Sequence, residues 1–314
     1  PSLLGTGRLA HLFDNLPWSG CREITIEANP EQIDRDFIAR LLDTTPANRV
    51  SIGVQSFNDD ELRLVGRRHD SRRAILAMEA LAAAPLLSYS IDLIYGLPLQ
   101  DESDWERNLT TALQFAPPHI SAYMLSYEPR TRLDAMRLAG KVTPADDETL
   151  CRMYGALCDR LSHNEYRHYE ISNFALEGHR ALHNSNYWRG LPYIGLGAGA
   201  HSCTSPGVRR ENLPDLRGYI ATGGLDAPHS IEHESTADRI NDYIMVALRT
   251  SRGINAEEFK SRFGAAEYKA LLRRAALEAA SGAGLIMESD GSIAFTEEGW
   301  LTSDAVIAEL FTES

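Results

Sequence analysis

The chain has 314 residues, 43% of them hydrophobic, and 44 acidic against 31 basic side chains give a net charge of −13. This length allows one large domain and a small one, with a sizeable buried core. The acidic balance excludes a general electrostatic attraction to nucleic acid, which is not expected as a partner. No apolar run of about 18 residues and no signal-peptide pattern occurs, so we expect a cytoplasmic protein without a membrane span, and peripheral membrane contact stays open.

Four runs with the character of β-strands recur in the first half of the chain, and each presents polar groups near its end. Glu27 ends the first run, Gln55 the second, and Asp92 lies in the third. Tyr123 and Ser126 lie at the end of the fourth. The separations of the first three fit strand-helix-strand units of about 30 residues or more. We therefore expect parallel strands whose C-terminal ends share one face, where ligands bind in such folds.

Amphipathic helices are expected between these strands. Residues 31–43 carry apolar side chains at helical spacing and form the first crossover helix. Local signals predict the other helix ends: Asn58 caps a helix over 59–66, Ser71 caps one stopped by Pro85, and Ser103 caps one ended by Pro117 and Pro118. A helix over 146–163 and a single strand over 166–173 complete this alternation, so we expect an α/β domain over 1–175.

The remaining chain divides into two parts of different character. Residues 176–235 show weak periodicity and many glycine, proline and asparagine residues, and a long irregular segment is more often functional than a simple connector. Residues 236–314 predict three helices over 236–250, 255–263 and 265–283, two short strands around 285–287 and 293–295, and a last helix. This order resembles a small winged-helix module, but the interleaved acidic residues disfavour DNA binding.

The strand-end residues have complementary binding chemistry. The carboxylates of Glu27 and Asp92 accept hydrogen bonds from ribose hydroxyls or pair with an ammonium group, and the amide of Gln55 both donates and accepts. Arg67, in the loop after the second strand, pairs with a carboxylate of the same ligand. Together they suit a nucleoside with an amino-acid tail, although each could also be a satisfied polar group at a barrel rim. No glycine-rich dinucleotide or Walker motif follows these strands.

The irregular segment adds aromatic and imidazole groups. Tyr187 and Trp188 suit a flat hydrophobic ligand, and packing in an aromatic core explains them equally well. His183, His201 and Cys203 could ligate a metal, but without a closely spaced ligand pair a structural zinc is disfavoured. Either histidine is chemically able to bind haem iron.

Five ordered motifs identify a family resemblance. Glu-Ile-Thr-Ile-Glu-Ala-Asn-Pro, Ser-Ile-Gly-Val-Gln-Ser-Phe, Asp-Leu-Ile-Tyr-Gly-Leu-Pro, His-Asn-x-x-Tyr-Trp and Gly-x-Gly-x-Gly-Ala-His-Ser occur in this order. They resemble the radical S-adenosylmethionine enzymes related to oxygen-independent coproporphyrinogen III oxidase, and the fourth motif resembles the haem-chaperone branch, HemW. The resemblance implies a partial (β/α)6 barrel followed by the winged-helix-like module.

The resemblance also implies roles for individual residues. The positions that surround S-adenosylmethionine correspond to Glu27, Gln55, Arg67, Asp92, Tyr123, Ser126 and His201. The positions for haem or substrate correspond to His183, Asn184, Tyr187 and Trp188. The resemblance leaves the catalytic residues unassigned.

One departure from the family pattern is large. The family binds a [4Fe-4S] cluster through Cys-x-x-x-Cys-x-x-Cys and contacts methionine through Gly-Gly-Thr-Pro, and neither motif occurs in this sequence. Residues 1–4 are similar to the tail of the second motif, so we expect the cluster cysteines upstream of Pro1. Residues 1–314 then contain no metal ligands of the cluster.

The resemblance favours a haem chaperone that binds haem, S-adenosylmethionine and a [4Fe-4S] cluster and delivers haem to apoproteins. The alternative is an enzyme that oxidatively decarboxylates coproporphyrinogen III to protoporphyrinogen IX by means of a 5′-deoxyadenosyl radical. A third hypothesis is a non-catalytic binding protein that lacks the cluster. The motif at residues 183–188 favours the first hypothesis.

Overall fold

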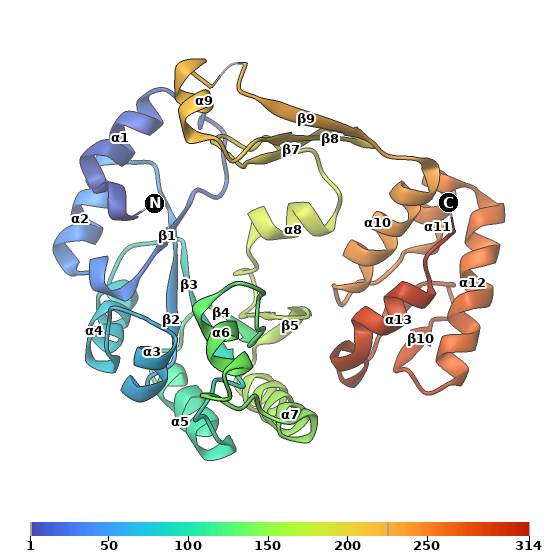
Figure 1. The fold of residues 1–314 in the computed structure, drawn as a ribbon, viewed down its shortest axis with the longest axis horizontal. Helices are drawn as coiled ribbons and strands as arrows, with labels where there is room; N and C mark the ends of the chain where they lie inside the picture. The colour runs from blue at the N-terminus through green and yellow to red at the C-terminus, as the bar shows by residue number, and fades with distance from the viewer. Residues whose placement is uncertain (1, 225, 314) are drawn as a thin grey trace. The chain divides into compact units, whose positions relative to one another are not determined.

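The computed structural model describes residues 2–224 and 226–313 (Figure 1). Its internal contacts divide the chain into two compact units, Pro1–Ala181 and Leu182–Ser314. No helix in the part of the chain that the structure describes is long and apolar enough to cross a membrane.

A six-stranded sheet organises the first unit, in the order β1-β2-β3-β4-β6-β5. The strands are β1 (Thr25–Ala28), β2 (Arg49–Gln55), β3 (Ser88–Tyr95), β4 (His119–Met124), β5 (Arg167–Glu170) and β6 (Asn173–Ala175). The first four strands are parallel, as the sequence predicts, and β6 is antiparallel to both β4 and β5. The expected α/β architecture is confirmed as an open, mixed sheet; among the described residues the sheet does not close into a barrel.

The prediction of a single strand over 166–173 is wrong. A turn at Ile171 and Ser172 reverses the chain and makes the antiparallel pair of β5 and β6. The backbone N–H of Ser172 donates to Glu170 Oε2 at 3.1 Å, which stabilises this turn. The alternation of side chains continues through the turn, so the strand pattern alone does not reveal the reversal.

Most helices of the first unit lie along one side of its sheet (Figure 1). The helices are α1 (Thr6–Asp14), α2 (Arg35–Thr44), α3 (Asp59–Leu64), α4 (Ser71–Ala82), α5 (Glu102–Leu113), α6 (Arg132–Leu138) and α7 (Asp147–His163), with short 3-10 helices at Ser2–Leu4 and Pro30–Gln32. The sequence pattern predicted neither α1 nor α6. The helix expected over 31–43 begins only at Arg35, because Pro30–Gln32 forms a separate 3-10 turn.

Helix caps show which local predictions hold. Asn58 caps α3, as expected, by accepting from the backbone N–H of Asp60. The caps predicted at Ser71 and Ser103 are wrong, since Asp70 caps α4 and Asp101 caps α5. In both helices the aspartate carboxylate accepts a hydrogen bond from the backbone N–H three residues later in the chain. Its negative charge also interacts favourably with the positive N-terminal end of the helix dipole.

The two faces of the sheet differ in polarity. One face carries fully buried aliphatic side chains, including Val50, Ile52, Val54, Ile91, Leu93 and Ile120. On the opposite face, the register pairs Glu27 with Ser51 and Asp92 with Ser121. A parallel sheet covered by helices on both faces usually has near-continuous hydrophobic strands. The alternation here instead directs a row of polar groups to one face, which positions the candidate site.

The second unit contains a small antiparallel sheet and a helical module. Its elements are α8 (Leu182–Trp188), β7 (His201–Ser205), β8 (Val208–Asn212), α9 (Leu216–Ala221), β9 (His229–His233), α10 (Thr236–Leu248), α11 (Ala256–Phe263), α12 (Ala265–Ala280), β10 (Leu285–Met287), β11 (Ile293–Phe295), a 3-10 helix (Glu298–Thr302) and α13 (Ser303–Glu309). The three helices, the hairpin and the last helix confirm the prediction for residues 236–314. The two short strands have the predicted bounds.

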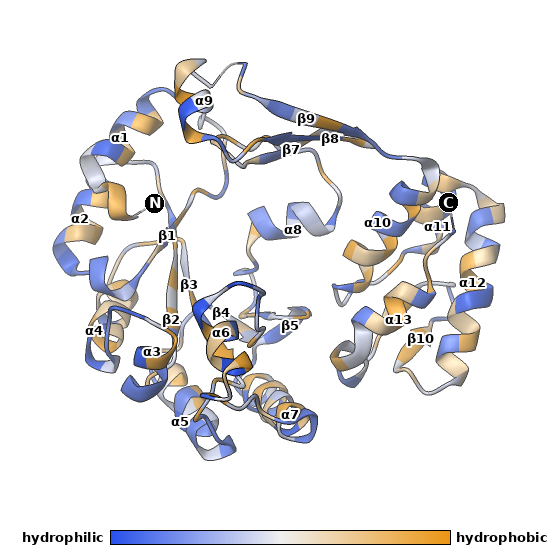
Figure 2. Ribbon diagram, viewed as in Figure 1, coloured by the Kyte–Doolittle hydropathy of each residue, from blue (hydrophilic) through white to orange (hydrophobic). Residues whose placement is uncertain are grey.

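The prediction of an irregular segment over 176–235 is wrong where the chain forms the helices α8 and α9 and three strands. Strands β7, β8 and β9 form a three-stranded antiparallel sheet. Figure 2 shows that hydrophilic residues make up much of these strands. Because few apolar residues alternate along them, the pattern that normally predicts a strand is weak.

Candidate functional site

The polar face of the first sheet borders a cavity of about 340 Å³. Its lining comprises Ser2, Leu3, Glu27, Ala28, Asn29, Ser51, Gly53, Gln55, Arg67 and Asp92. This volume lies at the lower end of the range for small-molecule pockets, about 300–1,000 Å³. The structure therefore brings four of the predicted site residues, Glu27, Gln55, Arg67 and Asp92, to one cavity.

Gln55 occupies an unusual backbone position at the end of β2. Its φ is 69°, in the left-handed region, and the pairing with β3 shifts between Gly53 and Gln55. A Cβ placed on Gly53 would lie 2.6 Å from Gln55 Nε2. The absence of a side chain at Gly53 thus provides the space for the Gln55 amide beside the cavity, and the left-handed backbone indicates a locally constrained residue.

Asp92 is half-buried in the middle of the polar face. Burial raises the pKa of Asp92 to about 6, and the nearby charge of Glu27 acts in the same direction. Hydrogen bonds from Ser121 and Ser51 and the charge of Arg49 lower the pKa in part. Asp92 therefore changes between its neutral and ionised forms close to physiological pH, unlike an ordinary aspartate.

A chain of hydrogen bonds continues from Asp92 to the far strands of the sheet. Ser121 Oγ donates to Asn173 Oδ1 at 2.9 Å, and Asn173 Nδ2 donates to Glu170. The strand β6 is required for this chain, which explains why the sequence pattern did not reveal Asn173 and Glu170 as supporting residues.

Tyr123 and Ser126 lie beyond this cavity. The side chain of Tyr123 is partly exposed, and burial together with the nearby charge of Asp92 raises its pKa. Ser126 Oγ donates to Glu128 Oε1 at 2.6 Å. Neither residue belongs to the cavity lining, although Tyr123 lies close enough to Asp92 to interact with it electrostatically.

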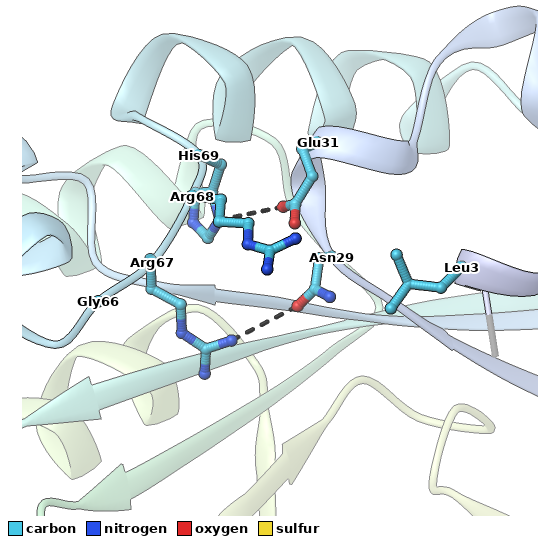
Figure 3. A pocket seen from close by; sticks show the side chains of 7 residues that line it. All are labelled: Leu3, Asn29, Glu31, Gly66, Arg67, Arg68 and His69. Carbon is cyan, nitrogen blue, oxygen red and sulfur yellow. Dashed lines mark hydrogen bonds and ion pairs between the residues drawn. The ribbon is translucent and has the colours of Figure 1, made fainter. Parts of the chain in front are cut away.

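Arg67 joins the cavity to a smaller side cavity of about 210 Å³. Figure 3 shows the residues that line the side cavity, which are Leu3, Asn29, Glu31, Gly66, Arg67, Arg68 and His69. The guanidinium of Arg67 donates to Asn29 Oδ1 at 3.4 Å. Burial lowers the pKa of Arg67, but a guanidinium keeps its charge at neutral pH. Since both cavities share Leu3, Asn29 and Arg67, we treat them as parts of one site.

A buried carboxyl group supports the loop that follows Gln55. Glu61 Oε2 accepts from Ser56 Oγ at 2.5 Å and from Gln100 Nε2 at 2.9 Å. Asn108 Oδ1 accepts from the backbone N–H of Phe57 at 2.7 Å. Burial raises the pKa of Glu61. The sequence pattern did not predict this network, and a charged residue inside the amphipathic pattern of α3 was its only signal.

The second unit contains the other predicted residues. His183, Asn184, Tyr187 and Trp188 all lie on α8, where the rings of His183 and Tyr187 meet edge to face at 4.9 Å. The guanidinium of Arg249 lies 5.1 Å from the ring centre of Trp188. His183 is exposed.

His201 lies apart from α8 in the sequence, on β7. Its side chain is exposed, and its Nε2 lies 3.9 Å from Glu211 Oε1. His201 thus belongs to the second unit, whereas Glu27, Gln55, Arg67 and Asp92 belong to the first.

Comparison with known proteins gives the family. Residues 20–112 match the Radical SAM superfamily, and residues 235–302 match the HemN C-terminal domain. The whole chain is 30% identical to the heme chaperone HemW of Bacillus subtilis and covers 83% of that protein. It is 32% identical to heme chaperone HemW of Escherichia coli, over 99% of this chain and 81% of the relative. This chain belongs to the HemW family of the radical SAM superfamily.

A solved structure agrees with this membership at the level of the fold. The chain superposes on the coproporphyrinogen III oxidase HemN of Escherichia coli, a radical SAM enzyme, with a TM-score of 0.80. The superposition covers 99% of this chain and 76% of that chain, at 20% sequence identity. At this identity the superposition shows a shared fold, and the activity of HemN is not transferred to this chain.

The residues present differ in how well they fit the two cofactors of the HemW family. The cavity offers carboxylates, an amide and a guanidinium, which match the hydroxyl, ammonium and carboxylate groups of S-adenosylmethionine. The cysteines do not fit a [4Fe-4S] cluster, because Cys21 and Cys151 are exposed, Cys158 is buried, Cys203 lies on β7, and no Cys-x-x-x-Cys-x-x-Cys spacing occurs.

Proposed function

We propose that this chain is a haem chaperone whose first unit binds S-adenosylmethionine and whose second unit contacts haem for delivery to apoproteins. The observation that carries the first part is the convergence of Glu27, Gln55, Arg67 and Asp92 on one cavity. Identity with HemW proteins over nearly the whole chain supports the second part.

The chemistry of S-adenosylmethionine assigns a role to each group in the cavity. The guanidinium of Arg67 pairs with the ligand carboxylate. The carboxylates of Glu27 and Asp92 accept from the ribose hydroxyls or the ammonium group and attract the sulfonium charge. The amide of Gln55 donates and accepts at the nucleoside. Tyr123 and Ser126 of the first unit are proposed to complete the surroundings of the ligand.

Bound in this site, S-adenosylmethionine would supply a 5′-deoxyadenosyl group. The residues of this chain bind and orient the ligand. The Asp92 carboxyl also holds or releases a proton close to neutral pH, because its pKa is about 6.

The haem contact is proposed for α8. The imidazole of the exposed His183 is able to ligate iron, and Tyr187 and Trp188 offer flat apolar faces to a porphyrin. Asn184, between His183 and Tyr187 in the sequence, has an amide that can donate a hydrogen bond to a haem propionate. The proposal fails if haem added to the full-length protein produces no Soret shift.

The Gly53→Ala variant is expected to weaken S-adenosylmethionine binding about tenfold without unfolding the protein. The new Cβ would displace the flexible end of Gln55 from the place it occupies 2.6 Å away, while the backbone at position 53 accepts alanine. Equilibrium dialysis of the full-length protein measures the affinity, and thermal denaturation measures the stability.

Gly155→Ala provides a matched control, because a Cβ at this position of α7 meets no atom within 4 Å. We expect its affinity to equal that of the parent protein. Unchanged affinity in Gly53→Ala would show that the Gln55 amide does not contact the ligand.

The affinity for S-adenosylmethionine is expected to rise about tenfold between pH 5 and pH 7, as Asp92 ionises with a pKa of about 6. The ionised carboxylate attracts the cationic ligand, and the neutral acid does not. Isothermal titration calorimetry across this range measures the effect. The Asp92→Asn variant should bind more weakly and lose this pH dependence; a variant that keeps the full dependence would assign the titration to another group.

The raised pKa of Asp92 also predicts how the stability of the unliganded protein depends on pH. Because the pKa of Asp92 is higher in the folded chain than its ordinary value of 3.8, folding takes up a proton between these values. The free energy of unfolding therefore falls as the pH rises through about 4 to 6, and this contribution is absent from Asp92→Asn.

A further inference from the structure

Glu31 and His69 lie side by side in the side cavity (Figure 3). The His69 side chain is 1% exposed, and its Nδ1 lies 3.5 Å from Glu31 Oε2. Its other ring nitrogen, Nε2, lies 3.0 Å from the carbonyl oxygen of Val54. Both His69 Nδ1 and Glu31 Oε2 are shielded from solvent, and neither has a hydrogen-bond partner among the described residues.

The number of hydrogens on the His69 ring decides whether its contact with Glu31 is a hydrogen bond. A carbonyl oxygen only accepts, so His69 Nε2 carries a hydrogen and donates it to Val54. In a neutral imidazole Nδ1 then has a lone pair, which faces the lone pairs of the Glu31 carboxylate. Two buried acceptors in contact are unfavourable. One proton between Nδ1 and Oε2 turns the contact into a hydrogen bond, whichever atom carries it.

The groups around His69 indicate which acid shares a proton with its Nδ1. Burial lowers the pKa of His69 and the charge of Arg67 acts in the same direction, while Val54 and Glu31 oppose them. Arg68 also lines the side cavity, and Arg73 of α4 donates to the backbone carbonyls of Pro30, Glu31 and Ile33. Among the described residues no second carboxylate lines the side cavity, so Glu31 is the acid that shares a proton with His69 there.

The pair connects three segments that form the proposed ligand site. His69 is two residues after Arg67 and contacts Val54, the residue before Gln55. Glu31 follows the end of β1, three residues after Ala28. We propose that Glu31 and His69 share one proton and so position Arg67 and Gln55 for the ligand. This inference rests on the proposed binding of S-adenosylmethionine at this site.

Two substitutions at position 31 separate proton sharing from simple packing. In Glu31→Gln the side-chain amide donates permanently to Nδ1, so we expect the affinity for S-adenosylmethionine to stay within about twofold of the parent. In Glu31→Ala the donor is absent, and we expect about a tenfold loss. Equal losses in the two variants would overturn the proposal, because they would show that the charge of Glu31 is what matters.

A nuclear magnetic resonance titration of the imidazole nitrogens reads the pair directly. We expect a protonated Nε2 in the parent, and nitrogen shifts of His69 that change with pH as the pair releases its proton. In Glu31→Gln these shifts should stay constant. Equal titration in both proteins, or a bare Nε2, would overturn the proposal. Because this readout needs no ligand, it distinguishes failure of the pair from failure of the parent to bind S-adenosylmethionine.

Discussion

Replacing Arg67 by alanine is expected to lower the affinity of the full-length protein for S-adenosylmethionine by about hundredfold. Arg67 contributes the guanidinium that both parts of the cavity share, and burial removes it from competing water. A charge-assisted pair with the ligand carboxylate is therefore stronger there than on the surface. Isothermal titration calorimetry measures the loss.

Two companion variants test the cause of this effect. Arg67→Lys keeps the charge but not the planar fork, so we expect an intermediate affinity. Arg63→Ala removes an exposed arginine of the neighbouring helix α3 that pairs with Asp60, and it should bind like the parent. If Arg67→Ala retains parental affinity, the assignment of the ligand carboxylate to Arg67 is wrong.

Replacing His183 by alanine is expected to weaken haem binding by roughly hundredfold and to change the Soret band, because the proposed iron ligand is lost. His183 is exposed on α8, next to the ring of Tyr187. Haem titration followed by absorption spectroscopy measures both the affinity and the ligand environment. The same variant should bind S-adenosylmethionine normally, since the described lining of the first unit's cavity includes no residue of α8.

His163→Ala is the matched control for haem. His163 is an exposed histidine at the end of α7, and its Nδ1 contacts only the local carbonyl of Asp159 among the contacts described. Its removal should leave the Soret band and affinity unchanged. If both variants lose haem equally, binding to surface histidines is nonspecific; if neither loses haem, the iron ligand lies outside α8.

The strands of the first sheet were largely predictable because their signals are local. Runs of β-branched residues ending in polar groups predicted β1 to β4, and the helical lengths between them predicted parallel pairing. The alignment of parallel strands then explains why Glu27, Gln55 and Asp92 meet at one cavity. The C-terminal helices and hairpin were predicted for the same reason.

Other features depend on competition between nearby or distant groups. Ser71 and Asp70 both match a helix cap, and only the folded backbone shows which side chain accepts the bond. Strands β7 to β9 carry too few apolar residues for a clear pattern, and their pairing with each other makes them a sheet. Contacts across the sheet, more than propensity, thus decide these elements.

The sequence by itself determined the α/β alternation, the family resemblance and the kinds of polar group at the strand ends. These features depend only on the types and spacing of residues that are close together in the sequence. Only the tertiary structure decided which of these groups meet. It raised the pKa of Asp92 by burial, connected Ser121 to Asn173 through the antiparallel return of β6, and placed Glu31 against His69. Such contacts join residues 38 to 52 positions apart, and only strand register and burial bring them within hydrogen-bonding distance.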